Sequence, residues 1–230
     1  MSVPAPNRES VRFRDRHEAG LALAGQLREY SGRDDVVILG LPRGGIPVAS
    51  AVAHALHAPL DVLVVRKLGV PGHAELAMGA IASGGVRVLN DEVVAWYRPS
   101  AAAVDAVARA EEVELERRER AYRGVRPPAP IEGRVVVLVD DGLATGSTMR
   151  AAVLAVRRLK PSRVVVAAPV GAPETCRALR EIADDVVCAL MPEALTAVGL
   201  WYDIFDQTTD EEVRALLAAS SADADVGRGV

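Results

Sequence analysis

A run of apolar residues, Val135 to Val139, ends directly in two adjacent carboxylates, Asp140 and Asp141. The run is short and rich in β-branched residues, which is typical of a parallel strand buried on both faces. The carboxylates then lie at the carboxyl end of this strand, where open α/β sheets bind their ligands. The glycine- and hydroxyl-rich loop at 142–148 leads into a helical pattern, and a helix N-terminus attracts phosphate. The stretch therefore predicts a site for a sugar phosphate, which carries both a diol and a phosphate.

Short apolar runs alternate with helical patterns through most of the chain. Strands are expected at 36–41, 60–65, 135–139, 163–169 and 186–190, and helices at 15–30, 47–57, 100–123, 147–159 and 174–183. This alternation predicts an α/β fold with a doubly wound, mostly parallel sheet. Two shorter apolar stretches, 77–82 and 86–89, flank Ser83-Gly84-Gly85 and predict a hairpin.

The length of 230 residues favours a single domain with a sizeable core. We expect this domain at 13–217, after a loose N-terminus at 1–12 and before a disordered tail at 218–230. The helix at 100–123 is expected to be an insertion. Its second half is almost entirely charged, which is typical of a solvated helix face; a lid or a subunit contact is the alternative.

Composition narrows the classes of partner. The net charge of −4 argues against a general nucleic-acid binder, which needs a basic surface. The chain has no run of about 18 apolar residues, and its first residues lack the apolar core of a signal peptide. Cys176 and Cys188 form no metal-ligand pattern. We therefore expect a cytoplasmic protein with no nucleic-acid and no membrane partner.

The stretch at 134–149 resembles the phosphoribosyl-pyrophosphate (PRPP) signature of type I phosphoribosyltransferases, which is an apolar strand, two acids and a Thr-Gly-x-Thr loop. The resemblance implies that Asp140 and Asp141 hold the ribose diol. It implies that the 5′-phosphate lies against the loop residues Ala144, Thr145, Gly146, Ser147 and Thr148. No Lys follows Gly146, so the loop is not a Walker loop. The chain is most similar in look to bacterial phosphoribosyltransferase-domain proteins whose acceptor is not defined.

Two earlier segments extend the resemblance to the pyrophosphate group. Arg43, Gly44 and Gly45 follow the first strand, where glycines let the backbone approach a ligand and an Arg can grip phosphate. Arg66 and Lys67 are expected to end the second strand, where adjacent cations are costly to bury without an anion. In the family, such residues meet the pyrophosphate of PRPP. The segment 68–76 would then be a flexible flap, in which His73 or Glu75 could assist proton transfer.

The resemblance implies a transferase that moves the phosphoribosyl group from PRPP to a nitrogenous acceptor, with Mg²⁺ bound mainly through PRPP. Asp140, Asp141, Lys67 and Arg43 would be its catalytic residues, and the enzyme is expected to be a homo-oligomer. Trp201, Tyr202 and Asp203 are candidate acceptor contacts; alternatively, these aromatic residues only cover a core edge. The N-terminal segment with Phe13, Arg14 and Arg16 could also contribute to the hood, the variable part that selects the acceptor. Other interpretations are a PRPP-binding regulator without turnover and an enzyme acting on another ribose phosphate.

Overall fold

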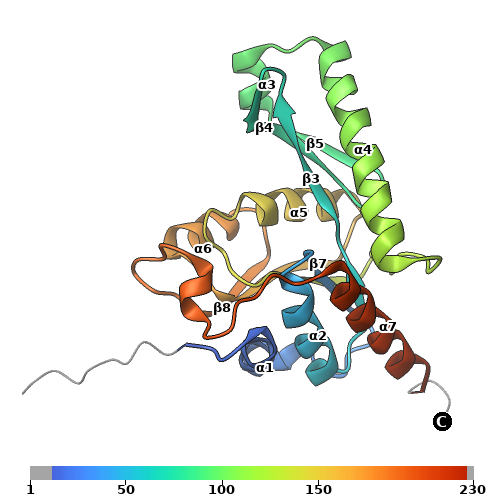
Figure 1. Ribbon diagram of the computed structural model, residues 1–230, viewed down its shortest axis with the longest axis vertical. Helices are drawn as coiled ribbons and strands as arrows, with labels where there is room; N and C mark the ends of the chain where they lie inside the picture. Colours follow the sequence, from blue (N-terminus) through green and yellow to red (C-terminus); the bar gives the residue numbers. More distant parts are fainter. Residues whose placement is uncertain (1–11, 227–230) are drawn as a thin grey trace, which may run out of the picture.

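A five-stranded, wholly parallel sheet forms the centre of the molecule (Figure 1). The structure is a computed structural model that describes residues 12–226, so nearly all of the N-terminal segment expected to be loose lies outside the described residues. The sheet has the order β2-β1-β6-β7-β8. Its strands are β2 (Leu60–Val62), β1 (Val36–Gly40), β6 (Val135–Val139), β7 (Arg163–Val170) and β8 (Asp185–Leu190).

Helices cover both faces of this sheet, which confirms the predicted doubly wound fold (Figure 1). One face carries α1 (Arg16–Gln26), α2 (Gly45–Leu56) and α7 (Asp210–Val226), and the other carries α5 (Ser147–Arg158) and α6 (Pro173–Leu179). Every residue of β1 and β6 is buried. Successive side chains of β6 pack on opposite faces of the sheet, since Val137 lies in one core and Leu138 in the other. A strand between two cores needs apolar residues throughout, which explains its unbroken apolar run.

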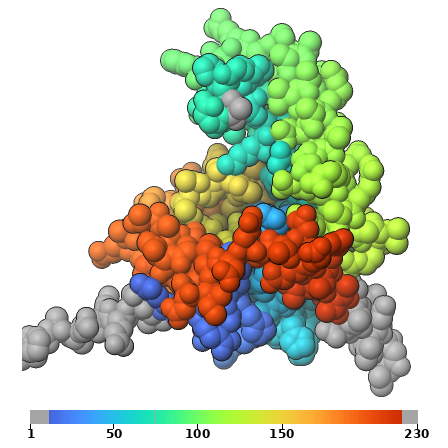
Figure 2. Space-filling view, viewed as in Figure 1, coloured from blue at the N-terminus to red at the C-terminus, as the bar shows by residue number. Residues whose placement is uncertain are grey.

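A second sheet stands away from this body (Figures 1 and 2). It is antiparallel, in the order β3-β4-β5, and packs with α3 (Asp91–Tyr97) and α4 (Ala101–Arg123). The strands are β3 (Val65–Val70), β4 (His73–Ala82) and β5 (Val86–Leu89). The predicted hairpin at 83–85 is therefore confirmed, as is the long helix, whose first turn is capped by Ser100. We call residues 65–123 the arm.

The arm corrects two expectations. The second strand of the main sheet ends at Val62, so Arg66 and Lys67 lie within β3 and not at the end of β2. The segment 68–76, expected to be a flexible flap, instead completes the β3–β4 hairpin. Its tight connection is Pro71-Gly72, and Gly72 has a φ of +84°. Pro followed by Gly suits a type II turn, which requires a positive φ at its third residue. The segment therefore has the composition of a loop, although most of it belongs to two paired strands.

Two helices were not expected. The helix α7 continues to Val226, so the residues from 218 to 226 are not the disordered tail that their small side chains suggested. Alanine has the highest helix propensity, and Val213 and Leu217 anchor this helix in the core. The helix α3 has seven residues and buries none of them fully, so its apolar pattern is too short to predict a helix. None of the helices in the described part of the chain is both long and apolar enough to cross a membrane.

Candidate active site

The sheet reverses its direction of winding between β1 and β6. β2 lies on one side of β1, whereas β6, the next strand of this sheet in the sequence, lies on the other. The two strands pair in register from Val36 opposite Val135 to Gly40 opposite Val139. Their carboxyl ends therefore stop at the same level, and the loops that follow are neighbours. Such a switch point is where open α/β sheets bind ligands.

The loop after β1, residues 41–45, lies directly against the two acids after β6. A Cβ atom added to Gly44 would lie 2.7 Å from the Asp141 Cγ and closer still to Oδ2. One added to Gly45 would lie 2.7 Å from the Val139 carbonyl oxygen and 2.9 Å from the Asp140 Cα. The clash at Gly45 is with backbone atoms, so this position requires glycine, whereas a side chain at Gly44 would displace the Asp141 carboxylate. The preceding peptide bond, Pro42–Arg43, is cis.

The two carboxylates are partly buried and close together. The Asp140 Oδ1 accepts a hydrogen bond of 2.9 Å from the Asp141 backbone N–H. Burial, followed by the neighbouring Asp141 charge, raises the pKa of Asp140 well above its ordinary value. Burial also raises the pKa of Asp141, against the opposing effect of the Arg16 guanidinium. Such carboxylates gain from hydroxyl donors that replace lost water, which suits a diol.

The loop at 142–148, which we call the hydroxyl loop, is held in place by α6. Gly146 has a φ of +66°, and a Cβ there would overlap the Thr175 Cγ2. The Thr175 hydroxyl donates a hydrogen bond of 2.5 Å to the Ala144 carbonyl. Ser147 begins α5, so the backbone N–H groups of the first turn face the open side of the loop. Thr145 and Ser147 are exposed there, as a phosphate cradle requires.

The arm contributes a single cation to this loop. The Lys67 Nζ donates a hydrogen bond of 2.6 Å to the Ser147 Oγ. Arg66 points away and binds Glu111 of α4, with 2.7 Å between its Nε and the Glu111 Oε2. Successive residues of a strand face opposite sides, so only one of the two adjacent cations can reach the site. The structure therefore places Lys67 at the site, whereas Arg66 binds a residue within the arm.

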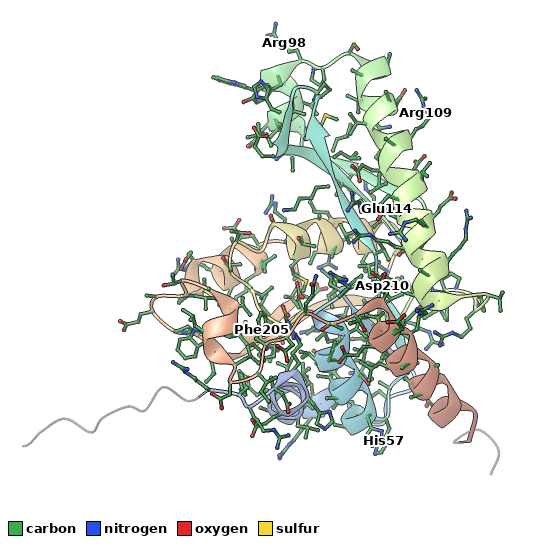
Figure 3. All side chains as sticks on the ribbon, viewed as in Figure 1. His57, Arg98, Arg109, Glu114, Phe205 and Asp210 are labelled. Atoms are coloured by element: carbon green, nitrogen blue, oxygen red, sulfur yellow. The ribbon has the colours of Figure 1, made fainter. Side chains whose placement is uncertain are left out.

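Arg43 reaches the first residue of α7, which lies beneath the lower end of α4 (Figure 3). Its Nη1 lies 3.8 Å from the Asp210 Oδ1, a long contact between half-exposed groups. The same carboxylate oxygen accepts a hydrogen bond of 3.0 Å from the Tyr122 hydroxyl. Such a loose ion pair leaves the guanidinium free to turn toward a bound anion.

The N-terminal segment pairs with the segment 191–206 next to the two acids. We call Phe13 together with 191–206 the hood. The Phe13 N–H donates to the Trp201 carbonyl at 2.9 Å, and the Asp203 N–H donates to the Phe13 carbonyl at 2.9 Å. Tyr202 is buried, and its hydroxyl donates a hydrogen bond of 2.6 Å to the Asp141 carbonyl. A buried tyrosine in this position cannot stack on an acceptor. Trp201 is half-buried and Asp203 is exposed, so these two stay candidates.

His73 and Glu75 do not join the site. Both lie at the start of β4, at the outer end of the arm (Figure 1). The His73 ring lies 5.7 Å from the Tyr97 ring of α3. Thr175 and Asp210, in contrast, contact the site although neither was expected there, and Arg16, expected only as a possible part of the hood, binds Asp141. Their partners are distant in the sequence, so no local motif could have revealed them.

Comparisons with known proteins agree with this geometry. The family described as the phosphoribosyl transferase domain matches residues 16–202. Two Mycobacterium tuberculosis proteins, named provisionally as phosphoribosyl transferases, are 50% identical over 211 residues, which is 92% of this chain and 47% of theirs. The chain thus spans about half the length of these curated relatives.

Among solved structures, TT1426 from Thermus thermophilus superposes with a TM-score of 0.82 and 44% sequence identity. The match covers 90% of this chain and 98% of that one. It therefore includes the arm as well as the main sheet. The matched range, the sheet order and the loops at its switch point agree: the chain belongs to the phosphoribosyl transferase domain family.

Proposed function

We propose that this protein transfers the 5-phosphoribosyl group of PRPP to a nitrogenous acceptor and releases pyrophosphate. The observation that carries the proposal is the meeting of three groups at one switch point. The Arg43 loop packs on Asp141, and Lys67 reaches the hydroxyl loop that follows it. A hydroxyl-rich loop, two carboxylates and two cations thus lie at the same edge of the sheet, which supports a site for a sugar phosphate with a second anion.

Each part of PRPP has a complementary surface. The 5′-phosphate would lie on the hydroxyl loop, at the N-terminus of α5, with the Lys67 ammonium beside it. The ribose hydroxyls would donate to Asp140 and Asp141. The pyrophosphate would lie over Gly44 and Gly45, with the Arg43 guanidinium turned from Asp210 toward it. This arrangement assigns Lys67 to the 5′-phosphate side, whereas the family resemblance assigns it to the pyrophosphate.

Catalysis would follow from the charges of these groups. As the bond at C1 breaks, positive charge grows on the ribose and negative charge grows on the leaving pyrophosphate. The two carboxylates oppose the first, and Arg43, once it has turned toward the pyrophosphate, opposes the second. The described residues contain no group of three or more His, Cys, Asp or Glu side chains that could hold a metal ion. Mg²⁺ bound together with PRPP would supply further neutralisation of the pyrophosphate charge.

The acceptor would enter between the hood and C1 of the ribose. The hood contains three acidic residues, Glu193, Asp203 and Asp206, and no basic residue, and Asp203 is exposed. An acidic surface favours acceptors with N–H donors and disfavours acceptors that carry a carboxylate. Amino- or imino-bearing rings and amines are thus the acceptor class that we expect.

The test is release of pyrophosphate from PRPP and Mg²⁺, measured across purines, pyrimidines, carboxylated rings and small amines. We expect turnover with at least one neutral or cationic acceptor. Asp140→Asn with Asp141→Asn should abolish PRPP binding, whereas Asp34→Asn, an exposed residue at the opposite end of β1, should leave it unchanged. Intact PRPP binding in the double variant would refute the proposal. Tight PRPP binding by the wild type without turnover on any acceptor would favour a regulator.

A further inference from the structure

We propose that Arg16 is a positioning residue that keeps the Asp141 carboxylate ionised and correctly oriented for the ribose diol. This inference rests on the proposed function, because it assigns a role in PRPP binding. Arg16 is the first residue of α1, and no motif marks it. The same side chain also contacts the hood, so it joins the donor and acceptor parts of the site.

The contact between Arg16 and Asp141 is close and shielded from water. The Arg16 Nε and Nη2 both lie 2.9 Å from the Asp141 Oδ2. The two side chains are only 12% and 17% exposed, so the pair is far less screened than a surface ion pair. Both donors use one oxygen. Neither donor uses the other oxygen, Oδ1, to which a ribose hydroxyl could donate.

The hood contacts the rest of the Arg16 guanidinium. The Arg16 Nη1 donates a hydrogen bond of 2.7 Å to the Asp206 carbonyl. The guanidinium carbon lies 3.9 Å from the centre of the Phe205 ring, over its face, and Figure 3 shows this ring above α1. A planar guanidinium can make these contacts together, whereas the ammonium of Lys cannot. Arg16 is therefore fixed in place before any ligand binds.

The charged groups around Asp141 explain why a fixed cation is needed. Asp140 is adjacent and repels a second negative charge, and the Tyr202 hydroxyl is already committed to the Asp141 backbone. Gly44 packs against the carboxylate and excludes water from that side. Arg16 supplies a positive charge in direct contact with Asp141. Without it, burial would favour the protonated form of Asp141.

The experiment measures PRPP affinity by calorimetry with Mg²⁺ between pH 5 and pH 8.5. Removing an opposite charge in contact raises a carboxyl pKa by about 1 to 3 units. In Arg16→Met, we expect the pH midpoint of PRPP binding to move upward by about that amount, so affinity falls most at the acidic end. Arg16→Lys should show a smaller shift. Arg28→Met, an exposed residue just beyond α1, should keep the wild-type profile.

A second measurement separates positioning from a general loss of structure. In an Asp141→Asn background, Arg16→Met should produce a much smaller pH shift, because the carboxylate that it contacts no longer titrates and only its weaker effect on Asp140 is left. A wild-type pH midpoint in Arg16→Met, or an equal shift with and without Asp141, would overturn the inference. Failure of the wild type to bind PRPP at any pH would overturn the proposed function itself, and this inference with it.

Discussion

Gly44→Ala should damage the site through a single methyl group. The added Cβ would lie 2.7 Å from the Asp141 Cγ, whereas carbon atoms in contact usually lie about 3.5 to 4.0 Å apart. One of the two groups must therefore move by about 1 Å. The carboxylate is the side chain of the pair, so it would turn away and lengthen its bonds to Arg16. The Arg43 loop cannot retreat easily, because Gly45 is packed on the Val139 carbonyl.

The expected effects are of two kinds. Forcing an extra carbon into a packed site costs about 1 to 3 kcal/mol of folding stability. Misplacing a binding group by about 1 Å costs on the order of 100-fold in activity, here through PRPP binding. Urea denaturation would measure the first effect, and calorimetry with PRPP and Mg²⁺ would measure the second.

Gly25→Ala is the matched control. Gly25 lies in α1, and a Cβ there would meet nothing within 4 Å. Alanine in a helix interior is favoured over glycine by about 0.8 to 1 kcal/mol, so this variant should be slightly more stable and should bind PRPP normally. If Gly44→Ala behaved like Gly25→Ala in both assays, the contact between the Arg43 loop and the acid pair would be irrelevant to binding. The reasoning about the switch point would then be wrong.

Three other outcomes are expected. Lys67→Met should weaken PRPP binding by about tenfold or more, as loss of a charge-assisted contact does, whereas Arg66→Met should change only stability. Equal losses of binding in the two variants would contradict the conclusion that only Lys67 faces the site. Asp140→Asn should be more stable than the wild type at pH 7. Folding raises the pKa of Asp140, so the wild type has the full stability from this residue only below the ordinary pKa of 3.8 and loses it as the pH rises. Urea denaturation at pH 4 and at pH 7 should show a smaller difference between the two proteins at pH 4. PRPP should raise the melting temperature more with Mg²⁺ than with a chelator, and equal shifts would argue against a metal-borne pyrophosphate.

The main sheet could be predicted from the sequence because its evidence is local. Val135 to Val139 is apolar at every position because it is buried on both faces, and turn residues mark its end. The same signal identified β1 and β7. Asp140 and Asp141 follow such a strand directly, so their place at the carboxyl edge required no knowledge of distant contacts.

The arm and the hood could not be predicted in the same way. The side toward which Lys67 points depends on where β3 begins, and two residues between β2 and β3 decide this. The Tyr202 hydroxyl donates a hydrogen bond to the Asp141 carbonyl, 61 positions earlier in the sequence, and only the folded chain brings the two together. Arg66 resembles Lys67 in charge and position, yet Glu111 of α4 is its partner. Pairings of this kind are properties of the tertiary structure.

The hood closure has a consequence for the order of folding. Arg16 and the Asp206 carbonyl are 190 positions apart, and the Phe13 bridge to Tyr202 also joins the two ends of the domain. Closing such a long loop is unfavourable until the strands between have already brought its ends together. During synthesis, the hydroxyl loop and the acids emerge before residues 202–206. The hood therefore adds its contacts with Arg16 and Asp141 last, over a sheet that has already formed.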